Sequence, residues 1–399
     1  MFTKYQKFLI VILALLQFTV VLDFMVLSPL GAVLLKELKI NAQEFGWVVS
    51  AYAFSAGLSG ILSAGFADKY DRKKYLLFFY VGFLLGTLMC AMADSYTTLL
   101  IARIVTGIFG GVISSISFAI GTDSFKIENR GRVIAYIQMA FSASQVLGIP
   151  IGLKLAELYN WHAVFYLIVI LGLLLGIVIF VFMKPVNAHL QLSEPKNAFR
   201  HLKDTLINPN YLKGFLATVL LSTGGYMMMP FASAFSTNNL GVALKDLPYL
   251  FGATGIVTIL TGPLVGKQSD KIGRFKIFLG GSLLSMLVIV FYTRLGPTPL
   301  PIVMVFNGLM FIGISARIIA SSSLISMVPK PQDRGAFMSI NSSIQQLSGG
   351  IAAAIAGLIV VKTNSGKLLH YEQLGMVVIC TMTIATIMIY RLEKHLLKQ

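Results

Sequence analysis

Charged residues are scarce in this chain of 399 residues. Asp, Glu, Lys and Arg make up 12% of the sequence and hydrophobic residues make up 56%, whereas soluble domains carry about 25% charged residues. The mean hydropathy is +0.80. Because a soluble domain could not cover so much apolar surface, the composition excludes an ordinary water-soluble enzyme, a disulfide-rich secreted domain and a disordered chain. It predicts an integral membrane protein.

Residues that bind metals or act as nucleophiles are also few. The two cysteines, Cys90 and Cys380, lie in apolar runs without metal-ligand spacing, and the five histidines are scattered over loops and span ends. No phosphate-binding glycine loop occurs. We therefore expect no cofactor, no metal and no direct use of ATP, and an enzyme is disfavoured. A membrane sensor or receptor is an alternative, although no stretch is long enough for a soluble output domain.

Apolar segments of about 20 residues, the length that crosses a bilayer, recur along the whole chain. We count twelve, at residues 6–35, 44–66, 74–93, 97–122, 132–156, 162–183, 212–238, 246–268, 275–294, 300–327, 335–361 and 370–390. The first is too long for the apolar part of a signal peptide, so we expect it to be retained. The polar stretch 184–211 predicts a linker between two six-helix bundles, 1–183 and 212–399.

The basic residues are distributed unevenly over the predicted loops. Twenty-three of the 32 Lys and Arg residues fall on the side that holds both termini and the linker, and seven fall on the other side. Since positive charge stays on the cytoplasmic side, we expect a multi-pass protein of the inner or plasma membrane with both termini in the cytoplasm. This topology accounts for the net charge of +16 without nucleic acid as a partner.

Two loop motifs are repeated at about half the length of the chain. Asp68, in the loop after the second span, matches Asp270 at a distance of 202 residues. Arg130, before the fifth span, matches Arg334 at a distance of 204 residues. Two matched pairs at nearly one period indicate duplicated halves.

On these motifs the chain resembles the major facilitator superfamily, and the resemblance covers its full length. The second loop copy follows the family signature at Gly266, Asp270, Gly273 and Arg274, whereas the first copy has Ala64 and Asp71 at two glycine positions. The fourth span carries Arg103 and Gly107, the fifth span carries Gly148, Pro150 and Gly152, and the first span carries Asp23 in a Leu-Asp-Phe-Met-Val context. The last two features are similar to the drug- and sugar-efflux proton-antiporter branch. The resemblance implies twelve helices in two pseudo-symmetric bundles and transport by alternating access.

The repeated loop charges predict a latch between the two halves at the cytoplasmic side. Carboxylates at these helix ends can cap a neighbouring helix and pair with arginines; the alternative is charge that serves topology alone. The predicted latch residues are Asp68, Arg72, Asp270, Arg274, Arg130 and Arg334.

Three charged residues fall inside predicted spans: Asp23, Arg103 and Arg317. A charge near the bilayer centre costs at least about 2.5–3.5 kcal/mol, so each should face the interior and have a partner. We predict that Asp23 carries a proton and that Arg103 modulates it; substrate binding and a purely structural pair are alternatives for Asp23. Arg317 either binds an anionic group of the substrate or pairs with backbone carbonyls.

Polar side chains at helical spacing predict the lining of a central cavity, because a polar stripe facing lipid would be costly. The predicted lining residues are Gln138, Ser142, Gln145, Tyr226, Met229, Arg317, Asn341 and Gln345. The run from Gly224 to Pro230 predicts a break in the seventh span, and Gly107, Gly148, Pro150 and Gly152 predict close helix packing and a bend.

The sequence thus favours an all-α secondary transporter that exports a small molecule in exchange for protons, without an obligate protein partner and with a monomer expected. Proton-coupled uptake by a symporter, or uniport of a small organic solute, is the alternative within transporters. The identity of the substrate is not encoded in any motif; apolar drugs, sugars, lipids and small organic anions are all compatible with it.

Overall fold

The computed structural model describes residues 2–64, 70–125, 133, 136–137, 139–140, 143–187, 198–330, 333–363 and 365–396. At residues 64, 122–123, 198–201, 270, 334–336 and 339 it describes the backbone alone.

The described chain is almost entirely helical. Its elements are α1 (Lys4–Val26), α2 (Gly31–Glu37), α3 (Ala42–Ala64), α4 (Arg72–Ala91), α5 (Tyr96–Asp123), the π-helix η2 (Ser144–Gly148), α7 (Ile149–Leu158), α8 (His162–Phe182), α9 (Ala198–Leu206), α10 (Pro209–Tyr226), the 3-10 helix η4 (Met229–Phe231), α11 (Ala232–Asn238), the 3-10 helix η5 (Leu244–Asp246), α12 (Leu247–Ile272), α13 (Arg274–Tyr292), α14 (Leu300–Ile325), α15 (Arg334–Ile359), β1 (Val361–Lys362), β2 (Leu368–Leu369) and α16 (Tyr371–Leu396). The two strands form an antiparallel hairpin in which Val361 pairs with Leu369.

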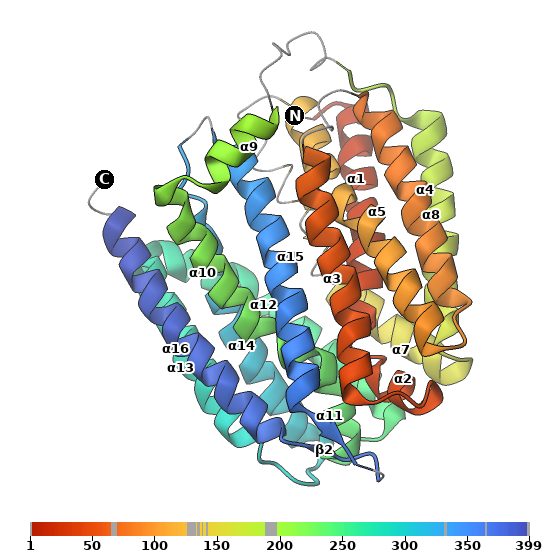
Figure 1. Ribbon diagram of the computed structural model, residues 1–399, viewed down its shortest axis with the longest axis vertical. Helices are drawn as coiled ribbons and strands as arrows, with labels where there is room; N and C mark the ends of the chain where they lie inside the picture. Colours follow the sequence, from red (N-terminus) through yellow and green to blue (C-terminus); the bar gives the residue numbers. More distant parts are fainter. Residues whose placement is uncertain are drawn as a thin grey trace.

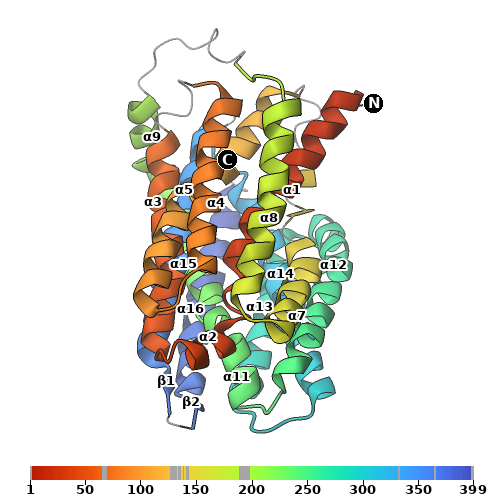
Figure 2. The same ribbon diagram turned by 90° about the vertical axis from the view of Figure 1, so that its right-hand side faces the viewer.

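The long helices run side by side along the longest axis of the molecule (Figure 1). Both termini and α9 lie at one end, which we call the terminal end, and α2, α11 and the hairpin lie at the opposite end (Figures 1 and 2). Eleven stretches of the described chain are helical, long and apolar enough to cross a membrane. The fifth predicted span, 132–156, is described without gaps only from residue 143 onward, as η2 and the first part of α7.

Two of the predicted spans are interrupted helices. The first continues after a turn at residues 27–30 as the short helix α2. The seventh ends as an α-helix at Tyr226 and resumes through η4 and α11. This confirms the break predicted from the run Gly224–Pro230, where glycines and a proline weaken the helix.

Local sequence explains where several helices begin. Thr3 and Ser95 form capping boxes with Gln6 and Thr98 at the starts of α1 and α5. Asp71 caps α4 by accepting a hydrogen bond from the Lys74 backbone N–H. The helix α8 exposes Leu174, Ile177 and Phe180 on its surface, as expected where a helix faces lipid.

The buried apolar residues form three clusters. The largest contains residues of both halves, including Leu30 and Phe45 from the first and Phe231 and Tyr371 from the second. The other two each belong to one half, one packed around α1, α4 and α5 and the other around α10, α14 and α15. Because the shared cluster includes α2, α11 and the hairpin, the two halves have a common core toward the opposite end and separate cores toward the terminal end.

Within the first half, α3 and α5 approach closely at glycines. A Cβ atom at Gly111 would lie 2.3 Å from the carbonyl oxygen of Ala56 and 2.5 Å from its Cα. We expect Gly111→Ala to destabilise the protein by about 1–3 kcal/mol, because a backbone contact cannot yield as a flexible side chain can. Thermal unfolding in detergent measures this effect.

Gly262→Ala is the matched control, because no atom of the described residues lies within 4 Å of its Cβ position in α12. Alanine there should leave stability unchanged or raise it slightly, since it is the better helix former. Equal melting temperatures for the two variants would contradict the close packing of α3 on α5.

Candidate functional site

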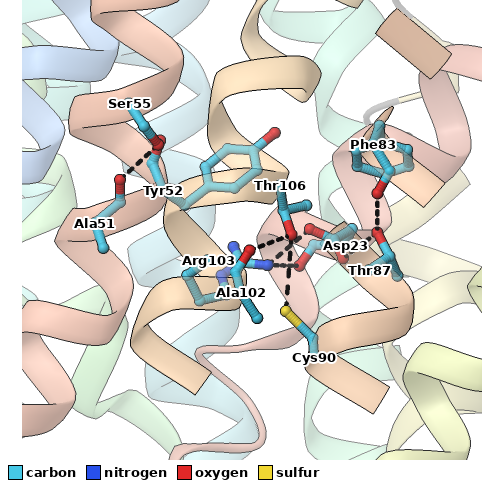
Figure 3. Close-up of polar contacts among 10 residues, drawn as sticks. All are labelled: Asp23, Ala51, Tyr52, Ser55, Phe83, Thr87, Cys90, Ala102, Arg103 and Thr106. Atoms are coloured by element: carbon cyan, nitrogen blue, oxygen red, sulfur yellow. Dashed lines mark hydrogen bonds and ion pairs between the residues drawn. The ribbon is translucent and has the colours of Figure 1, made fainter. Parts of the chain in front are cut away.

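The two charged residues predicted in the first and fourth spans form a buried ion pair. Arg103 Nη1 lies 2.7 Å from Asp23 Oδ2, and the two side chains are 1% and 0% exposed. Thr87 on α4 donates a hydrogen bond to Asp23 Oδ1 at 3.2 Å. Figure 3 shows the side chains converging from α1, α4 and α5. The structure thus brings Asp23 and Arg103 together, although 80 residues separate them in the chain.

The aromatic ring of Tyr52 packs against the Arg103 guanidinium. The Tyr52 ring lies 4.5 Å from the Arg103 guanidinium carbon, a distance that permits cation–π attraction. Gly107 makes this approach possible, because a Cβ there would lie 2.0 Å from Ser55 Oγ and 2.5 Å from the Tyr52 carbonyl oxygen. The close helix packing predicted at Gly107 is therefore part of the site.

Contacts between aromatic rings connect the ion pair to the second half of the molecule. Phe24 follows Asp23 in the chain, and its ring lies 5.3 Å from that of Tyr52 and 6.1 Å from that of Tyr226 on α10. A displacement of Asp23 would therefore move Phe24 and change its ring contacts at the junction between the two halves.

The chemistry open to this site is proton binding. Asp23 is the one fully buried acidic side chain among the residues described with side chains. Removing either partner of a buried ion pair typically costs about 3–5 kcal/mol, because it leaves an uncompensated charge. Breaking the pair therefore favours a neutral Asp23, which requires a proton. In the described part of the chain, no group of three His, Cys, Asp or Glu residues is arranged to hold a metal ion.

Arg317 on α14 is buried, and no acidic partner for it is found among the residues described with side chains. Its side chain lies over the Phe278 ring, with 5.6 Å between the guanidinium carbon and the ring centroid, and the residue is 3% exposed. Its Nε and Nη2 have no hydrogen-bond partner among the described residues. The predicted pairing with backbone carbonyls is therefore not observed at these two nitrogens, and the predicted anionic ligand remains the open alternative.

The predicted polar stripe on α15 is divided between two roles. Asn341 is buried and accepts a hydrogen bond of 2.6 Å from Thr218 on α10, so it joins two helices of the same half. Gln345 is exposed and lies beside the Tyr226 hydroxyl. On the fifth span, Gln145 is partly buried, and its Oε1 has no hydrogen-bond partner in the described part of the chain. The side chains of Gln138 and Ser142 lie outside the described residues.

A π-helix lies at the position where the bend in the fifth span is predicted. The π-helix η2 ends at Gly148, and α7 begins with Ile149 and Pro150. A Cβ at Gly148 would lie 2.5 Å from a Leu22 methyl group, and one at Gly152 would lie 3.1 Å from a Val26 methyl group. These glycines therefore let the fifth span pack against α1 next to Asp23.

Few of the predicted latch residues can be compared with the structure. Asp68 and Arg130 lie outside the described residues, as do the side chains of Asp270 and Arg334. Arg72 is buried at 6% exposure, and Arg274 donates a hydrogen bond to the Met327 sulfur at 2.9 Å.

Two other contacts at the terminal end escaped the sequence analysis. Tyr211 donates a 2.5 Å hydrogen bond to Asp333, and Glu393 accepts one of 3.1 Å from the Phe275 backbone N–H at the start of α13. Asp333 and Glu393 lie at helix ends, and this position in the sequence could have indicated such contacts. Their partners, Tyr211 and Phe275, belong to no repeated motif.

A closure between the two halves at the opposite end was also missed. Ser28 donates a hydrogen bond to the Met229 carbonyl oxygen, and Ser233 donates one of 2.8 Å to the Ser28 carbonyl oxygen. Lys362 on β1 donates one of 2.7 Å to the Leu35 carbonyl oxygen near the end of α2, and partial burial lowers the pKa of this lysine. Met229, predicted to line the cavity, therefore lies at this closure.

Comparison with known proteins identifies this arrangement. The family profile described as Major Facilitator Superfamily matches residues 13–353 and 214–398. The chain belongs to the major facilitator superfamily. It is therefore a multi-pass membrane transporter of small molecules with the alternating-access fold, and it is not an enzyme.

The facilitator is similar to relatives of bacterial origin. It is 25% identical over 355 residues to the uncharacterized MFS-type transporter YceJ of Bacillus subtilis, covering 87% of this chain and 88% of that protein. It is 23% identical over 348 residues, or 84% of each chain, to a bicyclomycin resistance protein homolog of Haemophilus influenzae. It is 34% identical to Multidrug resistance protein 3 of Bacillus subtilis over 131 residues, or 33% of this chain and 26% of that protein.

Solved structures share the fold at low sequence identity. A bacterial homolog of the human lysosomal transporter Spinster, in an inward-facing and unoccupied conformation, superposes with a TM-score of 0.79 at 16% identity over 100% of this chain and 99% of that chain. A D-xylose-proton symporter superposes with a TM-score of 0.78 at 16% identity over 95% of each chain.

Proposed function

We propose that this facilitator exports a small organic solute in exchange for protons and that the Asp23–Arg103 pair is its proton-binding site. The observation that carries the proposal is the geometry of the pair: a fully buried carboxylate held by a guanidinium at 2.7 Å. Such a carboxylate is stable when ionised only while the guanidinium stays in place.

The exchange follows from the competition between a proton and Arg103 for the same carboxylate. With the pair formed, Asp23 is ionised and the site has no net charge. When a movement of the halves separates the pair, Asp23 takes up a proton, since a lone buried carboxylate is far costlier than a neutral one. Phe24 couples this change to Tyr226, because its ring contacts those of both Tyr52 and Tyr226.

Two further observations support the proposed direction of transport and the proposed orientation of the protein in the membrane. Two relatives are named for resistance to drugs, and export from the cell is the simplest way in which a transporter confers it. The excess of Lys and Arg on the side of the termini favours a cytoplasmic location of the terminal end. The shared core toward the opposite end then corresponds to an arrangement closed on the outside.

Flux in proteoliposomes tests the exchange. A thermal-shift screen of drugs, sugars and organic acids selects the compound that stabilises the purified protein most, and its flux is measured with and without an imposed pH gradient. We expect accumulation against its concentration gradient on the side of higher proton concentration. Flux of equal rate with and without the gradient would contradict proton coupling, and accumulation on the opposite side would indicate symport.

Cysteine labelling in intact cells tests the orientation. Lys36 in α2 and Lys203 in α9 are exposed at the two ends of the molecule. In a Cys380→Ala background, we expect a membrane-impermeant maleimide to label Lys36→Cys rapidly and Lys203→Cys only after lysis. The reverse pattern would place the termini outside and overturn the assignment.

A further inference from the structure

The second half of the transporter contains a buried cation that has no counter-charge among the residues described with side chains. Arg317 is 3% exposed, and its Nε and Nη2 have no hydrogen-bond partner among the described residues. The ion pairs described in this half do not include it. An unpaired guanidinium at this depth is unfavourable in the membrane, so a group that neutralises it would bind with considerable driving force.

The acidic residues of this half all stand at helix ends. From residue 209 onward they are Asp246, Asp270, Asp333, Glu372 and Glu393. Asp333 and Glu393 are engaged with Tyr211 and Phe275, and Glu372 pairs with Arg294 at 3.8 Å. Arg317 lies eight residues before the end of α14, or about 12 Å along the helix axis. Among the residues of this half described with side chains, no acidic group lies at the level of Arg317, so an anion from outside the chain would take this position.

The first half contains an acidic side chain beside its buried arginine, whereas the second half has none at the corresponding place among the described residues. Its buried arginine, on the fourth span, faces an aspartate on the first span. Arg317, on the tenth span, faces Gly224 on the seventh: a Cβ at Gly224 would lie 4.0 Å from Arg317 Nη2. The two arginines are not in the same register, since the repeat of 204 residues matches Arg317 to Ile113. The relationship between the helices is nevertheless the same, with glycine in place of the acid.

The space beside this glycine adjoins an open part of the molecule. No atom lies within 4 Å of a Cβ built at Gly225, which is exposed, and α10 ends one residue later at Tyr226. The hydroxyl oxygen of Thr381 on α16 lies 3.2 Å from the Gly224 Cβ position. This hydroxyl donates a hydrogen bond of 2.8 Å to the Val378 carbonyl oxygen, and rotation of its O–H bond would direct the proton to an anion beside the guanidinium. A solute that enters beside this end of α10 would approach Arg317.

We propose that Arg317, Gly224 and Thr381 form a binding subsite for the carboxylate of an anionic substrate, with the substrate's carboxylate in the position of the missing acidic side chain. The inference rests on the proposed transport function and names the substrate class as organic monoanions. Chloride is the other source of a single negative charge, and the experiment separates the two.

The test uses matched probes that differ only in charge: 2-naphthoate with 2-naphthamide, and benzoate with benzamide. We expect the acids to raise the melting temperature of the purified protein more than the amides do. Arg317→Gln should weaken binding of the acids roughly tenfold or more, as expected when a charge-assisted hydrogen bond is lost, and Arg317→Lys should restore part of it. Arg294→Gln, at an exposed arginine, should bind the acids as the wild type does.

A second variant supplies the missing acid within the chain. Gly224→Asp should raise the melting temperature without any ligand and abolish the difference between acids and amides, whereas Gly224→Asn should do neither. A higher melting temperature of Gly224→Asp cannot result from misfolding, which would lower it.

The proposal is overturned if the acids stabilise the wild type no more than the amides do, or if Arg317→Gln and Gly224→Asp bind the acids unchanged. Chloride that stabilises the wild type as strongly as the acids would overturn the assignment to an organic substrate. Asp23→Asn should keep the preference for acids, so failure of proton coupling and failure of this subsite are distinguishable.

Discussion

Asp23→Asn is expected to abolish accumulation driven by a pH gradient while the protein still binds its substrate. Asparagine keeps the shape of the side chain and can accept the hydrogen bond from Thr87, but it cannot exchange a proton. Arg103 then remains buried without a counter-charge, for which we expect a loss of about 3–5 kcal/mol in the free energy of unfolding. Concentrative flux in proteoliposomes and thermal unfolding measure the two effects.

Two variants separate a lost proton site from a damaged protein. Asp23→Glu restores an ionisable carboxylate and should recover part of the gradient-dependent flux, and Asp94→Asn, at an exposed aspartate between α4 and α5, should transport as the wild type does. Wild-type accumulation by Asp23→Asn under a pH gradient would show that the proton binds elsewhere.

Gly357→Val is expected to reduce transport at least about fivefold with little loss of folding stability. A Cβ at Gly357 would lie 3.1 Å from the Ala42 carbonyl oxygen and 3.3 Å from the Gly46 Cα, so α3 and α15 meet there backbone to backbone. The larger side chain should disfavour this closed arrangement by about 1–3 kcal/mol, which shifts its population roughly 5- to 150-fold. Because the contact joins the two halves, each half should keep its own fold.

Reactivity of a buried cysteine reports this change. Ala42 is 2% exposed, and in a background without Cys90 and Cys380 its replacement by cysteine should react faster with maleimide when Gly357→Val is present. Gly280→Val is the matched control, since no atom lies within 4 Å of its Cβ position on α13. Unchanged flux and unchanged labelling in Gly357→Val would contradict the role of this contact in closure.

Much of the architecture could be predicted because it depends on properties local to each segment. Span lengths follow from apolar runs, the duplication follows from motifs repeated at 202 and 204 residues, and the break before Pro230 follows from glycine and proline chemistry. A charge within an apolar span must likewise be compensated wherever it lies, so Asp23 and Arg103 could be selected without knowing their partners.

The partners themselves could not be predicted from local properties. Asn341 and Gln345 share one stripe of α15, yet the first bonds to Thr218 inside its own half and the second is exposed. Periodicity identifies the face of a helix but not the helix that covers it.

The sequence alone therefore determined the membrane class, the spans, the family resemblance and the buried charges. Only the tertiary structure decided that Asp23 meets Arg103 while Arg317 meets a glycine. The reason is that a contact between residues 80 or more positions apart depends on which helices pack together and how each is rotated about its axis. That arrangement results from the packing of the whole bundle, and no single segment encodes it.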